Sequence, residues 1–167
     1  MANNCFYTIK AVSKDKNALE RLIKIMNYED NEYYIYRCFS AYKDDEYDKN
    51  DLYVIMISGD CAWSCVKWFD NQEVFTDKDE NNAHYVTLDI LCEKLKIGIE
   101  LFSEEPGVGF QEHYVVHSNG NKVVDEEAEW IQKFFDEDGE ELDEPIEEGG
   151  FDNYCSFADA EEIYGEE

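Results

Sequence analysis

The uneven distribution of acidic side chains constrains this chain more than any other feature of its sequence. Residues 125–167 contain nineteen acidic side chains and one basic side chain, Lys133, whereas residues 1–28 contain five basic and two acidic side chains. The stretch 135–150 is dominated by acidic residues, glycine and proline, a composition typical of loops and tails. We therefore predict one folded domain over residues 1–134, with an acidic C-terminal extension over 135–167 that can dock back through the aromatics of Phe151 to Phe157.

The spacing of apolar residues predicts alternating strands and helices in the folded domain. Apolar residues recur at helical spacing from Leu19 to Met26 and from Leu88 to Leu95, and they alternate in shorter runs that favour strands. We interpret Asp44–Asp48 as a loop inside a hairpin, and Gly59 as the end of the second strand of that hairpin, followed by a short helix. Strands are predicted at residues 5–12, 33–41, 52–58, 97–102, 110–117 and 122–130.

This order of elements predicts an α+β fold. The elements follow the order strand, helix, strand, strand, helix, strand. This order is typical of the ferredoxin-like (split βαβ) fold, in which two helices cover one face of an antiparallel sheet. The added C-terminal hairpin (110–130) would follow this unit, because Asn119-Gly120 favours a tight turn.

Three segments resemble a known family. They are Gly59-Asp-Cys-Ala-Trp-Ser64, the stretch from Ser103 to Tyr114, and Gly149-Gly-Phe-Asp-Asn-Tyr154. These segments are similar to the YubB ferredoxin-like family of phage, plasmid and prophage proteins. The resemblance implies a ferredoxin-like fold and a mobile-element setting, and it implies no reaction.

Metal-ligating residues are present, but their spacing does not predict a metal site. Cys61 and Cys65 can share a helical face, whereas His113 and His117 on one strand would lie about 13 Å apart, too far for one zinc ion. The run Asp77-x-Asp79-x-Asn81 begins like a calcium loop, but it lacks the glycine and the glutamate that such a loop needs later. We expect six reduced cysteines, no metal and no cofactor.

A second class of function would use the carboxylates around the glycine turn. Glu104, Glu112 and His113 could perform acid–base chemistry or bind a small ligand in a site centred on the Ser103 to Tyr114 loop. No nucleophile with an ordered base and no phosphate-binding loop accompanies them. We therefore expect a protein that is not an enzyme, and this site remains the alternative.

The acidic C-terminal third points instead to a basic partner. A net charge of −27 repels nucleic acid and anionic membranes and favours encounter with cationic surfaces. We predict a cytoplasmic inhibitor, in a bacterial host, of a basic nuclease such as a CRISPR effector or restriction enzyme, or of another DNA-binding protein. The acidic side chains of this protein would occupy the nucleic-acid groove of that partner and mimic DNA. The predicted contact residues are Asp125, Glu126, Glu127, Glu129, Asp136, Glu137, Asp138, Glu140, Glu141, Asp143, Glu144, Glu147 and Glu148.

Overall fold

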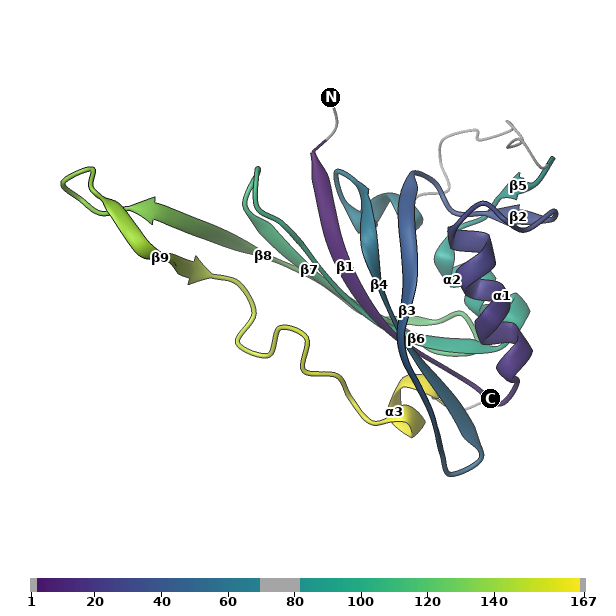
Figure 1. Cartoon of the computed structure of the whole chain (residues 1–167). Helices are drawn as coiled ribbons and strands as arrows, with labels where there is room; N and C mark the ends of the chain where they lie inside the picture. The colour runs from purple at the N-terminus through teal and green to yellow at the C-terminus, as the bar shows by residue number, and fades with distance from the viewer. Residues whose placement is uncertain (1–2, 70–81, 166–167) are drawn as a thin grey trace.

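The computed structural model describes residues 3–69 and 82–165, and strands dominate it (Figure 1). The strands are β1 (Asn4–Ser13), β2 (Tyr33–Tyr34), β3 (Cys38–Lys49), β4 (Leu52–Ala62), β5 (His84–Tyr85), β6 (Ile97–Glu105), β7 (Phe110–Val116), β8 (Lys122–Phe135) and β9 (Glu141–Gly149). The helices are α1 (Lys16–Met26), the 3-10 helix η1 (Cys65–Phe69), α2 (Leu88–Leu95) and α3 (Ala160–Tyr164).

Seven of these strands form one antiparallel sheet in the order β3-β4-β1-β6-β7-β8-β9. β1 lies inside the sheet and pairs with β4 on one side and with β6 on the other. The sheet is strongly twisted and curls beside α1 and α2 (Figure 1). The short strands β2 and β5 pair with each other in parallel, apart from the main sheet.

One face of the sheet, here called the helix face, carries the main core. Odd-numbered residues of β1 such as Tyr7 and Ile9 point to it, and Leu19 and Leu22 of α1 pack against them. α1 is amphipathic, so its apolar stripe covers the sheet while its polar residues remain in water. Trp68 of η1 closes this core, stacked edge-on against Tyr7 with ring centroids 5.0 Å apart.

The opposite face, here called the strap face, is covered by the returning C-terminal chain. Residues 151–159, the strap, leave β9 and run back to α3 (Figure 1). Phe102 of β6 forms T-shaped ring contacts with three residues of the strap, at centroid distances of 5.3 to 6.4 Å. These residues are Phe151, Tyr154 and Phe157. Farther along, Ile163 of α3 joins a second, smaller apolar cluster. β1 is therefore covered on both faces.

The predicted ferredoxin-like fold with two helices on one face is wrong for this chain. The sheet has seven strands and curls into an antiparallel half-barrel with three short α-helices. β7, β8 and β9 extend the sheet beyond β6, and β8 alone is 14 residues long. The sequence predicts the hairpin that corresponds to β7 and the first part of β8, but it does not predict residues 131–135 of β8 or any of β9. Most side chains of these two segments are exposed, so they lack the apolar alternation by which strands are recognised.

Two local predictions fail for related reasons. The loop predicted at Asp44–Asp48 is wrong, because these residues lie in β3, where backbone pairing with β4 sustains a strand although the side chains of this stretch face water. Gly59 was expected to end its strand, but β4 continues to Ala62. A Cβ atom at Gly59 would lie 2.0 Å from the carbonyl oxygen of Ser40, so the glycine permits close approach of β3 rather than stopping β4.

The substitution Gly59→Ala should therefore destabilise the fold. Overpacking at this crossing forces β3 and β4 apart, so we expect the free energy of unfolding to fall by about 1–3 kcal/mol. Urea denaturation would measure the loss. The neighbouring Ser58→Ala is the matched control, and its effect should stay within about 0.5 kcal/mol. Equal stability of Gly59→Ala and the parent protein would contradict the packing described here.

Candidate functional site

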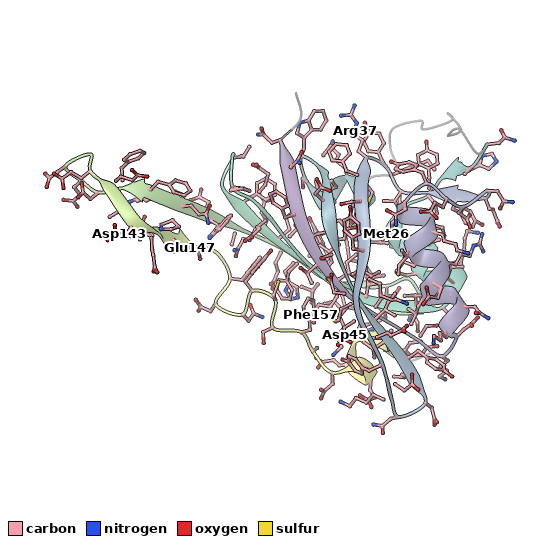
Figure 2. All side chains as sticks on the ribbon, viewed as in Figure 1. Met26, Arg37, Asp45, Asp143, Glu147 and Phe157 are labelled. Atoms are coloured by element: carbon pink, nitrogen blue, oxygen red, sulfur yellow. The ribbon has the colours of Figure 1, made fainter. Side chains whose placement is uncertain are left out.

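The second half of β8 and all of β9 form a two-stranded arm, residues 130–149, that projects from the body of the domain (Figures 1 and 2). β8 pairs with β7 only as far as Glu129, and from Trp130 onward its sole partner in the described structure is β9. The arm therefore has water on both faces and at its outer edge. Such an element contributes little to the core.

The end of the arm is an ordered turn built by Asp136. Its carboxylate accepts the backbone N–H groups of Asp138 and Glu140, each at 2.9 Å. The backbone N–H of Gly139 donates to the Asp136 carbonyl, and Gly139 adopts the left-handed conformation that glycine allows. This turn chemistry explains why a run of acids closes a hairpin instead of remaining a loose tail.

The arm combines acidic side chains with exposed apolar ones. Cross-strand pairing of Ile131 with Glu148 and of Lys133 with Ile146 places Ile131 and Ile146 on one face of the arm, and they are 48 and 49% exposed. Phe134 and Phe135 lie where the pairing becomes irregular, and they are 52 and 60% exposed. The only cation of the arm, Lys133, donates to Glu148 at 2.8 Å. Large exposed aromatics among charges are characteristic of contact surfaces rather than of solubilising tails.

The base of the arm is held by Trp130, which is 3% exposed. Its backbone N–H donates to the carbonyl of Gly109 at 3.1 Å, and the N–H of Gly150 donates to the carbonyl of Glu129 at 2.6 Å. Gly150 is left-handed, and a Cβ there would press on Gln111. These contacts anchor the arm to the β6–β7 turn and direct the strap back over the sheet.

All thirteen predicted contact acids are exposed, and they fall into two groups. Asp125, Glu126, Glu127 and Glu129 lie on the part of β8 that pairs with β7. The remaining nine lie on the arm and its turn, and Asp143 and Glu147 are labelled in Figure 2. The structure therefore gathers most of the predicted residues on one projecting element.

The alternative site around Ser103 to Tyr114 does not assemble its three ionisable groups. Successive residues of a strand point to opposite faces, so Glu112 enters the helix-face core while His113 lies under the strap. Glu104 shares the strap face but bonds Gln111, with Nε2 of Gln111 donating at 3.4 Å.

Glu112 is a buried hydrogen-bond centre that sequence reasoning did not identify as such. It is 1% exposed. Burial raises its pKa, whereas hydrogen bonds from Tyr114 and Ser64 lower the pKa and offset part of the rise. Six donors converge on its two oxygens, namely the hydroxyls of Ser64, Ser103 and Tyr114, the backbone N–H groups of Cys65 and Val66, and the thiol of Cys5. The carboxylate thereby ties the start of η1 to β6 and β7.

Three thiols lie beside this carboxylate. Cys61 and Cys65 have sulfur atoms 3.7 Å apart, and Cys5 joins them from β1. Hydrogen bonds from Cys61 and Cys65 lower the pKa of Cys5, while hydrogen bonding to Cys5 raises the pKa of Cys61 and burial raises that of Cys65. His113 does not belong to this cluster, since its Nε2 lies 2.7 Å from Glu100 on the strap face.

His113 forms a second buried polar centre, beneath the strap. Its Nε2 lies 2.7 Å from Glu100, and Glu100 also accepts the backbone N–H of Ala158, so the pair holds the strap. The imidazole stacks on Phe102 at 4.1 Å. Burial disfavours the charged ring, but hydrogen bonds to Glu100 and Glu126 outweigh it and raise the pKa of His113.

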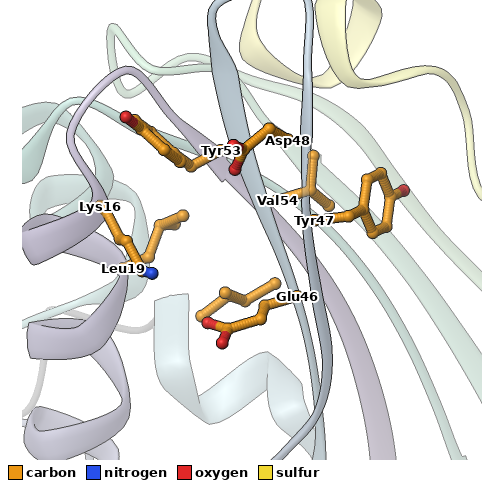
Figure 3. Close-up of a pocket in the computed structure, with 8 residues that line it drawn as sticks. Lys16, Leu19, Glu46, Tyr47, Asp48, Tyr53 and Val54 are labelled. Atoms are coloured by element: carbon orange, nitrogen blue, oxygen red, sulfur yellow. The ribbon is translucent and has the colours of Figure 1, made fainter.

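A surface pocket of about 280 Å³ lies between the N-terminal end of α1 and the β3–β4 hairpin (Figure 3). Lys16 faces it from the helix, and Glu46 and Tyr53 face it from the strands. It contains none of the predicted contact residues. Its mixed polar lining offers no set of convergent catalytic groups.

The calcium-like run Asp77 to Asn81 lies outside the described residues. None of the helices in the described part of the chain is long and apolar enough to cross a membrane. Comparison with known proteins adds no identity, since no family model, curated protein or solved structure matches the chain.

Removing the Glu112 carboxylate should cost much of the stability of the domain. In Glu112→Ala several buried donors lose their acceptor, so we expect the free energy of unfolding to drop by at least about 3 kcal/mol. Chemical denaturation would measure this. Glu127→Ala, which removes the exposed carboxylate directly opposite on β8, should change stability by less than about 0.5 kcal/mol. Similar effects of the two substitutions would refute the role of Glu112.

The His113–Glu100 pair should make stability depend on pH. Because the folded pKa of His113 is raised above its unfolded value of about 6.5, its contribution is complete below that pH and disappears as pH rises through the folded pKa. The stability difference between the parent and His113→Gln should therefore shrink from about pH 6 to about pH 9. Thermal unfolding across this range tests it, with exposed His84→Gln as control. If the stability difference between the parent and His113→Gln instead grows with pH, the pKa of His113 is not raised by folding.

Proposed function

We propose that this protein is an inhibitory binding protein that inserts its acidic arm into the basic groove of a nucleic-acid-binding enzyme, a nuclease being the best fit. The observation that carries the proposal is the arm itself. It is an ordered hairpin outside the core, and it presents nine acids and four exposed apolar side chains to solvent. An element with no role in the core is retained for what it contacts.

The charge density of the arm suits a groove built for nucleic acid. Nine acids and one lysine leave a net charge of −8 on residues 130–149. The arm is roughly 20 Å long at about 3.3 Å per strand residue. This is about one charge per 2.5 Å, between about 1.7 Å for duplex DNA and about 3.4 Å for one strand of it. The match supports mimicry and excludes direct binding of phosphates by the same surface.

The exposed apolar side chains of the arm would slow dissociation of a complex, which charge alone does not do. Electrostatic attraction speeds association, whereas buried aromatics at the centre of an interface slow dissociation. Phe134 and Phe135 lie near the end of the arm, between the acids of the turn and those of β9. A partner should therefore present a cationic groove with apolar contacts on its floor.

Charge reversal on the arm should weaken binding without unfolding the domain. The test variant replaces Asp138, Glu140, Asp143 and Glu144 with lysine and keeps Asp136, whose carboxylate builds the turn. A matched control reverses four exposed acids of the body, namely Glu29, Asp44, Asp48 and Glu93. We expect association with the partner to slow at least about tenfold for the arm variant and to change little for the control.

The partner would first be captured on the full-length protein and assayed for nuclease activity with and without it. The proposal requires that the parent protein inhibits the nuclease, that duplex DNA competes for the groove, and that salt weakens binding, since charges are screened beyond about 8 Å at physiological ionic strength. Phe134→Ala with Phe135→Ala should mainly raise the dissociation rate. Binding that is indifferent to salt, DNA and the arm variant would refute mimicry.

A further inference from the structure

Three buried cysteine sulfurs meet at one point of the helix-face core. Cys5 lies on β1, Cys61 lies near the end of β4, and Cys65 begins η1. All three residues are 0% exposed, and their sulfur atoms all lie within 4.8 Å of one another. The antiparallel register pairs Cys5 with Cys61, and the turn between β4 and η1 then returns Cys65 to the same place. Three separate elements thus supply one sulfur cluster.

The spacing of these sulfurs suits a thiolate metal centre. In a tetrahedral zinc site with bonds of about 2.3 Å, neighbouring sulfurs are about 3.8 Å apart. The Cys61 and Cys65 sulfurs are already 3.7 Å apart, and the Cys5 sulfur needs only a small displacement to complete the triangle. The four-residue separation of Cys61 and Cys65 is also within the range that structural zinc sites use.

A buried carboxylate, that of Glu112, adjoins the sulfur cluster. Glu112 Oε1 lies 3.9 Å from the Cys5 sulfur. Within residues 3–69 and 82–165, no lysine, arginine or histidine forms an ion pair with Glu112. A buried carboxylate is costly without a balancing charge, and its hydrogen bonds compensate only part of that cost. A divalent ion bound by three thiolates carries one net negative charge, so the metal would not balance this carboxylate, and the hydrogen-bond donors around Glu112 hold it instead.

We propose that Cys5, Cys61 and Cys65 bind one thiophilic divalent metal ion of the zinc type. Each thiol gives its proton to solvent as its sulfur binds the metal. Because every donor is buried, the site is structural: it fastens the N-terminal strand to the junction of β4 and η1. None of the three cysteines lies on the arm.

The test uses the full chain carrying Cys155→Ser, which removes the exposed thiol. The protein is unfolded with reductant and chelator, then refolded anaerobically with no metal, with Zn²⁺ or with Cd²⁺. We expect one metal ion per chain, a cadmium–thiolate absorption band, and a rise in melting temperature of about 5–10 °C at a hundredfold excess over the dissociation constant. In the same background, Cys92→Ser removes a buried thiol on α2 and should preserve all three results.

Single serine substitutions at Cys5, Cys61 and Cys65 should each abolish the thermal shift and weaken the absorption band. If a variant fails to fold, alkylation of the parent followed by mass mapping decides the question, because Cd²⁺ should protect these three cysteines and leave Cys92 and Cys38 unaffected. Refolded parent protein with no stoichiometric metal would overturn the proposal. So would protection of a different set of cysteines, or a Cys61–Cys65 disulfide that persists under these reducing conditions.

Discussion

The pairing of β1 with both β4 and β6 is the constraint on which the rest of the structure depends. Ten residues of β1 pair with β4, and eight pair with β6. This register sends alternate residues to the helix face and to the strap face, and both faces are covered. The same register sets Cys5 opposite Cys61 and Thr8 opposite Phe102. A shift by one residue would exchange the two faces and dissolve both buried polar centres.

The buried carboxylates and the exposed carboxylates of this protein have different roles. Glu112 and Glu100 are buried, and each is held by several donors that leave it one orientation. The acids of the arm are exposed, and most have no partner beyond water in the described structure. Buried carboxylates organise the body of the domain, since losing one leaves donors unsatisfied. Exposed carboxylates on a projecting hairpin affect stability little and are free to determine partner choice.

Some elements could be predicted from local patterns, and particular residues show why others could not. The helix from Leu19 to Met26 was found because its apolar stripe has the helical period, and the hairpin turning at Asn119-Gly120 was found because its turn chemistry is strong. β9 has no apolar alternation, and its only partner among the described strands is another exposed strand. The acids of β3 also resemble a loop in sequence, because their side chains face water although their backbone pairs with the largely buried β4. The fold class failed with them, because the number of strands decides the shape of the sheet.

The sequence by itself determined the charge asymmetry, the amphipathic helices and the acidic surface that a partner would meet, since these depend on composition and short-range spacing alone. Only the tertiary structure decided that the acids of residues 130–149 stand on an ordered arm and that His113 and Glu112 point to opposite faces. Only it could bring Cys5 within reach of Cys61 and Cys65. The physical reason is that strand pairing joins residues far apart in the chain through backbone hydrogen bonds, which every sequence offers equally. Which strands pair is settled by the packing of the whole sheet against its helices and strap.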